Sequence, residues 1–342
     1  MGDVTLTYED VLKRQKNNLA NEISWWPDYL YHFTDVHNVV SILYNGWIYS
    51  RSRATANHTM VNDNASRAVI EATRNDNKGY ARLYFRPLTP TQFHNEGYKP
   101  VEVRKSDINA SCPIPVFLCL GVNETLQLPG TKFAERGISG LHNDIKEGLE
   151  EFKKLEFSKI YHDGWFGSED REIIEYRHSE VIREGGFPIG LLLKWIICRT
   201  QAERETLLFL LRQCSIRLYN TYKDRILYEP RLRCFYNNGI FIKAVDIIDD
   251  VLIVSFNDSE QRYKNEDIKQ VQVLVKIEVA YKAADGVVVE VENGYAGFDY
   301  YTIRSCNMNL KYSGQYERIR VKVELNDISM YENEIDTRNR LF

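Results

Sequence analysis

The chain has 342 residues, of which 44 % are hydrophobic and 27 % are charged, and its formal net charge is −4. This length favours two domains, since one domain commonly spans roughly 100–200 residues, and the composition is that of a soluble globular protein. The net charge excludes a global basic field, so a nucleic-acid surface has to be local. No apolar run reaches the roughly 18 residues of a membrane-spanning helix, and the polar N-terminus is unlike a signal peptide. We therefore expect a cytoplasmic protein.

The first elements follow from the spacing of apolar residues. A helix is predicted over residues 4–21 and a strand over residues 29–33, where aromatic side chains cluster. The next segment has apolar residues at helical spacing, with Asp35 suited to cap its start and Gly46 suited to end it. Residues 50–79 are polar and predict a long loop, which is a type of segment that is usually functional or disordered.

The remaining elements of the first region alternate between strand and helix patterns. In chain order the sequence predicts a helical stretch at 65–74, strands at 81–85 and 116–122, a helix at 141–157, an extended segment at 171–183 and a helix at 207–217. After residue 240 the runs become β-branched and often alternate, at 251–256, 271–279, 286–291 and 319–325. We therefore place a boundary near Ile240, with one domain over 1–240 and a β-rich accessory domain over 241–342.

The cysteines do not suggest a crosslinked or metal-bound protein. All six are scattered and none belongs to a Cys-x-x-Cys pair: Cys112, Cys119, Cys198, Cys214, Cys234 and Cys306. The pattern predicts buried thiols in a reducing compartment. No ligand spacing supports zinc, so we expect no metal site.

Three short motifs carry candidate chemistry. Residues 31–34, Tyr-His-Phe-Thr, stand between a strand and a helix, where side chains and helix N–H groups can hydrogen-bond a polar ligand. Residues 84–90 end a strand with two prolines and predict a rigid loop. Each of these two motifs, taken alone, is more typical of a structural role.

The third motif contains Glu180 within residues 176–182. Positive neighbours favour an ionised carboxylate, and Arg177, His178 and Arg183 flank this one. Such a carboxylate suits stabilisation of an oxocarbenium-like sugar cation, which forms when a nicotinamide–ribose bond breaks. Taken alone, this motif is also explained by an ordinary surface ion cluster.

The order and spacing of the motifs resemble the DarT family, bacterial toxins that attach ADP-ribose from NAD to bases of single-stranded DNA. Residues 31–46 resemble its opening Y-H-x-T…N-x-x-S-I-L…G, and residues 83–90 resemble F-Y-F-x-P-x-x-P. Residues 176–182 resemble R-x-A-E-F/V-L-V, and residues 234–236 fit its terminal aromatic strand. The resemblance covers roughly residues 25–240.

The resemblance implies an α+β fold, in which a split antiparallel sheet with flanking helices holds NAD, followed here by a smaller all-β, sandwich-like domain. It implies that His32, Phe33, Thr34 and Ser41 line the NAD site and that Glu180 is the catalytic glutamate. NAD would be a co-substrate, and no metal would be needed.

The family also uses a loop arginine, which the resemblance places at Arg74. Such a group would grip the NAD phosphates bidentately or handle the proton of the acceptor base. Arg51, Arg53 and Arg67 are rivals, because this loop aligns poorly. Further residues in or near the expected substrate loop are candidates for stacking on bases or holding phosphates: Tyr80, Tyr84, Phe93, Arg82, Arg86, Lys99, Arg104 and Lys105.

Some features leave the acceptor open. Residues 134–139 stand where the family often has D-G-H/N-A, and they lack the histidine. The acceptor is therefore single-stranded DNA or, alternatively, RNA, since a Tyr-His-x-Thr opening also occurs in RNA 2′-phosphotransferases. A third alternative is a degenerate fold that only binds a partner, although His32, Thr34 and Glu180 together argue against it. The region after Ile240 would bind a partner such as an antitoxin, or nucleic acid.

Overall fold

The computed structural model describes residues 6–61, 75–104, 111–138, 144–258, 270–311 and 316–337. The helical stretch expected at 65–74 lies outside the described residues, and so do Arg67, Arg74 and Lys105. Within the described ranges, no helix is both long and apolar enough to cross a membrane.

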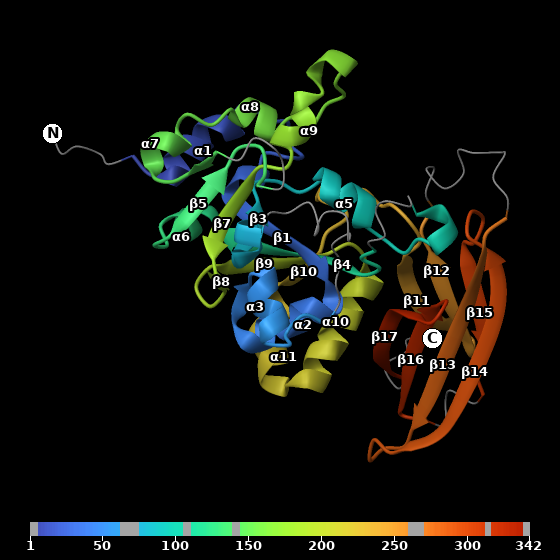
Figure 1. Cartoon of the computed structure of the whole chain (residues 1–342). Coiled ribbons are helices and arrows are strands. Elements are labelled where there is room, and N and C mark those ends of the chain that lie inside the picture. The colour runs from blue at the N-terminus through green and yellow to red at the C-terminus, as the bar shows by residue number, and fades with distance from the viewer. Residues whose placement is uncertain are drawn as a thin grey trace.

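One large sheet organises the first two thirds of the chain (Figure 1). Its eight strands lie in the order β10-β9-β4-β1-β3-β7-β5-β6, and neighbours are antiparallel except for β10 and β9. Their bounds are β1 (Tyr29–Asp35), β3 (Tyr80–Tyr84), β4 (Pro115–Gly121), β5 (Thr131–Ala134), β6 (Ile145–Lys146), β7 (Glu180–Glu184), β9 (Leu193–Cys198) and β10 (Ile226–Tyr228). A separate two-stranded sheet pairs β2 (Trp47–Tyr49) with β8 (Gly186–Pro188).

The large sheet has a weak seam between β1 and β3. The two strands share one register pair, Tyr31 with Tyr84, whereas β1 pairs with β4 from Tyr29 through Asp35. The sheet therefore consists of two halves that are joined by backbone over a very short distance.

Helices and 3-10 turns surround this sheet, and α2, α3, α10 and α11 gather on one side of it (Figure 1). The helices are α1 (Tyr8–Lys16), α2 (Val36–Asn45), α3 (Arg51–Ala56), α5 (Pro90–Asn95), α6 (Val122–Leu126), α7 (Leu149–Phe152), α8 (Phe157–Ile160), α9 (Glu172–Tyr176), α10 (Gln201–Cys214) and α11 (Ile216–Tyr222). The 3-10 turns are η1 (Trp26–Asp28), η2 (Asn75–Gly79), η3 (Val101–Val103), η4 (Ser168–Asp170) and η5 (Lys223–Arg225).

The predicted caps of α2 are confirmed. The Asp35 carboxylate accepts a hydrogen bond from the His37 backbone N–H at 3.0 Å, which satisfies one of the free donors at the helix start. Gly46 ends the helix with φ +74°, a left-handed conformation that glycine adopts without strain.

Several other predicted elements are wrong in type or extent. The single helix expected at 141–157 is wrong, because residues 145–146 form strand β6 and α7 begins only at Leu149, after Gly148 with φ +83°. The extended segment expected at 171–183 is extended only in β7, because Ile173 and Tyr176 stand three residues apart and are buried on the short helix α9. The long loop expected at 50–79 contains α3 and η2.

Two further sheets form the β-rich C-terminal region (Figure 1). One has the order β11-β12-β15 and the other has the order β14-β13-β16-β17. Their bounds are β11 (Ile242–Ile248), β12 (Val251–Phe256), β13 (Gln272–Lys282), β14 (Val288–Asp299), β15 (Ser305–Asn309), β16 (Arg318–Leu325) and β17 (Ile328–Asp336). Both sheets contribute to one apolar core, for example through Val254 and Val321, and all four predicted runs lie on strands, although the run at 286–291 enters its strand at Val288.

Helix α10 connects the two apolar cores. Its Leu207 belongs to the core of the large sheet, whereas Ala202 belongs to the core of the β-rich region. On the same helix, Glu205 accepts a hydrogen bond from the Tyr331 hydroxyl at 2.9 Å. The β-rich region is therefore packed directly on a helix that also supports the large sheet.

Candidate active site

Glu180 opens β7 and lies on a defined face of the sheet. It pairs with Tyr84 of β3 on one side and with Ala134 of β5 on the other. Residues that pair directly across antiparallel strands point to the same face. Tyr84 in turn pairs with Tyr31 across the seam, so Glu180 shares its face with aromatic side chains from both halves of the sheet.

Glu180 is buried, with 3 % of the residue exposed, and two groups contact its carboxylate. Its Oε1 lies 3.7 Å from a guanidinium nitrogen of Arg82, and its Oε2 accepts a hydrogen bond from the Ile138 backbone N–H at 3.3 Å. Burial raises the pKa of Glu180, whereas Arg82 and the Ile138 N–H act in the opposite direction. The site thus holds a desolvated carboxylate whose charge is balanced by one cation and one backbone dipole.

The cations that the sequence suggested as neighbours of Glu180 bind elsewhere, so that expectation is wrong. Arg177 donates hydrogen bonds to the carbonyls of His162 and Gly164, at 3.1 and 2.9 Å. Arg183 donates to the carbonyls of Pro129 and Gly186. Chain proximity was misleading because alternation along β7 and the turn before it direct these side chains away from the carboxylate.

Arg82 is the functional candidate whose role the sequence did not reveal. The sequence suggests it only as a phosphate-binding residue, yet it stands two positions before Tyr84 on β3 and so shares the face of Glu180. Only the register between β3 and β7 brings it to the carboxylate, and no sequence signal specified that register.

His32 lies at the seam, on the side of β1 that faces β3. Its Nδ1 is 3.3 Å from the Arg82 carbonyl oxygen. Burial lowers the pKa of His32 to about 4, against the smaller opposing effect of this contact, so the ring is neutral at pH 7. A neutral imidazole offers one donor and one acceptor to a ligand rather than a charge.

The residues next to His32 do not all share one face. Strand alternation places Phe33 with Tyr31 on the Glu180 face and sends His32 and Thr34 to the other. Phe33 packs against Phe117 with ring centroids 5.4 Å apart, and the buried Thr34 hydroxyl accepts a hydrogen bond from Asn38 at 3.2 Å. The side chains of His32, Phe33 and Thr34 therefore do not lie on one face of the sheet, although all three residues belong to the same end of β1.

Ser41 and Asn38 on α2 hold the segment that follows α3. The Ser41 hydroxyl donates to the Thr59 carbonyl at 2.6 Å, and the Asn38 side-chain oxygen accepts from the Val61 backbone N–H at 3.0 Å. Both contacts fix the chain at residues 59 and 61, directly before the range 62–74, which the structure does not describe. Ser41 thus has a structural partner in addition to any ligand.

The rival arginines Arg51 and Arg53 lie on α3. Arg53 stacks its guanidinium over Trp47 and Tyr49, at 5.8 and 5.0 Å from their ring centroids. This contact is a cation–π arrangement on a half-buried aromatic pair. Arg51 lies at the first position of the helix, and Arg74 itself cannot be placed because it falls outside the described residues.

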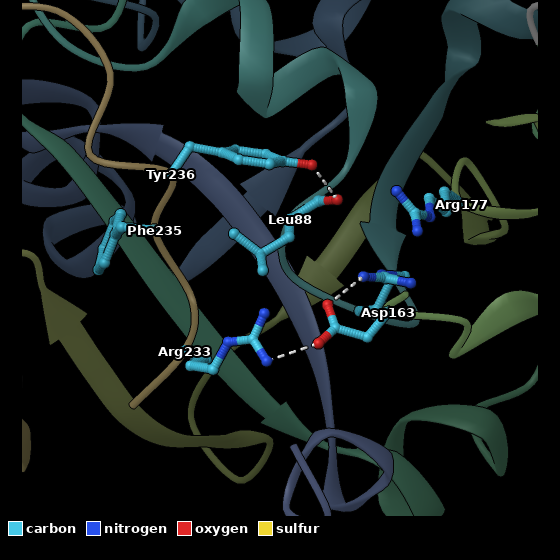
Figure 2. A pocket seen from close by; sticks show the side chains of 7 residues that line it. Leu88, Asp163, Arg177, Arg233, Phe235 and Tyr236 are labelled. Carbon is cyan, nitrogen blue, oxygen red and sulfur yellow. Dashed lines mark hydrogen bonds and ion pairs between the residues drawn. The ribbon is translucent and has the colours of Figure 1, made fainter. Parts of the chain in front are cut away.

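A pocket of about 260 Å³ opens beyond the end of the β3–β7 ladder, and Figure 2 shows its lining residues. They are Arg86, Leu88, Asp163, Arg177, Arg233, Phe235 and Tyr236. Asp163 lies between Arg233, at 2.7 Å, and Arg86, at 3.6 Å (Figure 2). With three guanidinium groups and one carboxylate, the lining is positive overall.

The pocket residues differ in how freely they meet solvent. Arg86 is 1 % exposed, donates to the Ile160 carbonyl and stacks 4.5 Å from the Trp26 ring, so its role is structural and it is not an open phosphate site. Desolvation lowers the pKa of Arg86 to about 9. The Arg233 side chain, by contrast, is 50 % exposed.

Other candidates from the substrate loop have mixed outcomes. Tyr84 shares the Glu180 face, and burial raises its pKa to about 12. Lys99 donates to the His94 carbonyl at 2.9 Å, and desolvation lowers its pKa to about 8. Residues 234–236 form an irregular segment, not the expected strand, because Tyr236 N–H is bonded to the Glu96 carboxylate at 2.9 Å instead of to a strand.

The cysteines and metal-ligand types form no centre in the part of the chain that the structure describes. All six cysteines are free thiols, and Cys214 is exposed whereas the other five are buried. Among the described residues, no group of three or more His, Cys, Asp or Glu side chains is placed to hold a metal ion.

The family model described as ssDNA thymidine ADP-ribosyltransferase, DarT, matches residues 31–225, which is more than half of the chain. No curated protein matches the sequence.

Among solved structures, the chain is similar to Thermus sp. 2.9 DarT in complex with NAD+, with 17 % identity and a TM-score of 0.45 over 61 % of this chain and 98 % of that one. It is similar to the same protein in complex with ADP-ribosylated ssDNA, with 16 % identity and a TM-score of 0.46 over 61 % and 97 %. Thermosipho africanus DarTG in complex with ADP-ribose gives 13 % identity and a TM-score of 0.44 over 64 % and 53 %.

The family model spans the seam, β7 with Glu180, and helix α10 up to η5. Because it covers more than half of the residues, the chain belongs to the DarT family, and its DarT domain is an NAD-dependent ADP-ribosyltransferase that uses NAD as co-substrate.

Proposed function

We propose that this protein transfers ADP-ribose from NAD to a base in single-stranded DNA, with Glu180 as the catalytic residue. The observation that supports this most directly is the geometry of Glu180, a buried carboxylate at the start of β7 that lies between Arg82 and the Ile138 N–H. A pre-oriented negative charge stabilises a developing cation better than a mobile, hydrated one.

The mechanism follows from this charge. As the nicotinamide–ribose bond breaks, positive charge develops at C1′, and Glu180 stabilises it. A nitrogen of the target nucleobase then forms the new bond at C1′ as nicotinamide leaves. The proton that this nitrogen loses is taken up by a Brønsted base. An unstacked base is reached most easily in a single strand, which favours ssDNA over a duplex.

The NAD site would lie along the seam, near His32, Phe33, Thr34 and Ser41. The neutral His32 ring and the hydroxyl of Thr34 suit ribose hydroxyls and an amide, which are uncharged partners. The phosphates require a cation, and for this role we propose Arg74, with Arg51 and Arg53 as rivals on α3.

The first experiment incubates the protein with labelled NAD and matched single-stranded DNA and RNA oligonucleotides. We expect label on DNA, and we expect Glu180→Gln to reduce the rate on the order of 10²–10³-fold, as loss of one electrostatic stabiliser typically does. Glu184→Gln is the matched control, because Glu184 lies on the same strand but is exposed. Label on RNA alone would change the acceptor, and an active, folded Glu180→Gln would refute the site.

We also propose that the arginine-lined pocket binds phosphates of the DNA that flanks the target base. Arg233 is the test residue because its side chain is half exposed, and Arg231, whose partner Glu229 lies outside the pocket, is the control. Arg233→Gln is expected to raise the oligonucleotide KM and to reduce the salt dependence of binding by about one phosphate contact. If Arg231→Gln has the same effect, the pocket has no special role.

The biological role that fits this chemistry is that of a bacterial toxin or phage-defence effector. The β-rich accessory domain, which we place at 241–342, would then bind an antitoxin or another regulatory protein. Expression of the active enzyme should arrest a bacterial host, whereas Glu180→Gln should not, and normal growth with soluble active enzyme would contradict this role.

A further inference from the structure

The turn formed by residues 134–138 runs beside the segment that leads into β7. The Ser179 hydroxyl donates to the Glu135 carbonyl, and Arg136 donates to the Tyr176 hydroxyl at 3.0 Å. Gly137 has φ +77°, and an added Cβ would lie 3.0 Å from the His178 carbonyl oxygen. Glu135, Arg136 and Gly137 therefore lie close to the 176–179 segment, and the positive φ of Gly137 together with this close approach favours glycine there.

Ile138, the last described residue of this turn, is bonded on both sides. Its N–H donates to the Glu180 carboxylate at 3.3 Å, and its carbonyl accepts from the Asn77 side-chain amide at 2.9 Å. Asn77 belongs to η2, directly before β3, and it is distant in sequence from the turn. Ile138 and Asn77 are 1 % and 8 % exposed, so water competes little for either hydrogen bond.

The two bonds act through different peptide groups of one residue. The N–H belongs to the peptide before Ile138 and the carbonyl to the peptide after it, so holding the carbonyl fixes where the residue, and with it the N–H, lies. The Ile138 side chain packs with Ala134 and Ile182 and anchors the same point from the apolar side. Without Asn77, the buried carbonyl would lose its partner and the turn would gain freedom to move towards solvent.

We propose that Asn77 is a positioning residue for catalysis, which holds the 134–138 turn so that the Ile138 N–H orients the Glu180 carboxylate. This inference rests on the proposed role of Glu180. The contact with the carboxylate is made by a backbone N–H of this turn, that of Ile138, and Asn77 holds the same residue through its carbonyl.

The test compares Asn77→Ala and Asn77→Asp in the full-length protein. The second variant keeps the shape of the side chain and lacks the amide donor. We expect kcat to fall roughly tenfold in both variants, because a misaligned charge stabilises the transition state less, while the KM for NAD changes less than twofold. Asn257→Ala is the control. Asn257 is also buried and its side-chain amide also donates to a backbone carbonyl, that of Gly239 at 3.1 Å, but both residues are far in sequence from Glu180.

A pH profile separates positioning from general loosening of the fold. The ionisable groups that face Glu180 are Arg82 and Tyr84 on β3, and β5 presents Ala134 opposite it. Loss of the Ile138 donor should therefore move the acid limb of kcat to higher pH in the Asn77 variants and not in Asn257→Ala.

The outcomes are distinguishable. An unchanged kcat in folded Asn77 variants, with inactive Glu180→Gln, overturns this inference alone. Activity retained in Glu180→Gln overturns the proposed catalytic site as well. Equal losses of kcat in the Asn77 variants and in Asn257→Ala, at equal losses of Tm, would show that Asn77 is merely structural.

Discussion

Glu180 is a carboxylate that is withdrawn from water and held beside a cation. Its nearest cation comes from β3 and its nearest N–H from the turn after β5, so three separate segments build one charge environment. Desolvation strengthens each of these interactions. The same desolvation makes the ionised state depend on its partners.

The pH dependence of the enzyme is expected to report this balance. In the proposed mechanism activity needs ionised Glu180, whose pKa is raised by burial, so activity should fall with decreasing pH sooner than an ordinary glutamate would require. Arg82→Gln removes the group that lowers this pKa, and the acid limb of kcat/KM should therefore move to still higher pH. An unchanged or lowered limb, measured in folded protein with the Arg82→Lys control close to wild type, would contradict this assignment.

Residue identities could be proposed from the sequence, but their mutual geometry could not. The motifs predicted Glu180 and His32 as candidates, and the structure places His32 on β1 and Glu180 on β7, with β3 between these two strands. Arg177 and Arg183 were expected beside Glu180 because they are close in sequence, whereas Arg82 is far away and lies there. Proximity in a sheet depends on which strands pair and in which register, and neither can be read from the residues of one strand alone.

Among the elements, α10 begins with an N-cap residue, Thr200, that also bonds to strand β11 of the β-rich region. The Thr200 hydroxyl accepts from the Glu203 N–H at 3.1 Å and donates to the Ile242 carbonyl at 2.8 Å. The first bond satisfies a free donor of the helix, and the second binds the first strand of the β-rich region. One side chain therefore stabilises both an element and its attachment.

Two substitutions at Thr200 should separate the loss of these two hydrogen bonds from the loss of the side-chain methyl group. Thr200→Ala removes the cap and leaves a buried carbonyl without its donor, so the free energy of unfolding should fall by about 2 kcal/mol. Thr200→Ser keeps the hydroxyl and should lose less than half as much. Urea denaturation of both variants measures this difference, and equal losses would show that the hydroxyl is unimportant.

Element prediction succeeded where local chemistry decided the structure. The Asp35 and Gly46 caps defined α2, and alternation of β-branched residues defined β12 over Val251–Phe256. It failed over residues 141–157, where Ile145 and Lys146 pair with β5 as strand β6 and a helix begins only after Gly148. Such a pairing with a distant strand is a tertiary contact, which helix propensity does not contain.

At the scale of the whole molecule, the β-rich region and the large sheet share α10 as a common support. The helix contacts both cores, and Tyr331 and Glu332 of β17 bond to Glu205 and Thr206 on it. The division at residue 240 stays a prediction about folding units. Contacts of this kind predict that loss of one core weakens the other.

Tryptophan fluorescence can test this coupling, because every tryptophan precedes residue 200: Trp25, Trp26, Trp47, Trp165 and Trp195. Leu325→Ala removes a fully buried side chain from the core of the β-rich region and should cost about 2–5 kcal/mol. If unfolding is cooperative, the urea midpoint of the tryptophan signal will fall. Leu274→Ala, at an exposed position of the same sheet, should leave it nearly unchanged, and an unmoved midpoint for Leu325→Ala would mean independent unfolding.

The single rung between Tyr31 and Tyr84 has a consequence for how substrate and scaffold depend on each other. Along most of the seam the two halves of the sheet are not joined by backbone pairing. A dinucleotide that lies there would contact both halves through its own hydroxyls and phosphates and so hold them together. Binding of NAD would then raise the free energy of unfolding, because a ligand that binds the folded state stabilises that state by mass action. In a cell, the resistance of this enzyme to heat and proteolysis would thus follow the supply of NAD, and depletion of its own co-substrate would loosen it.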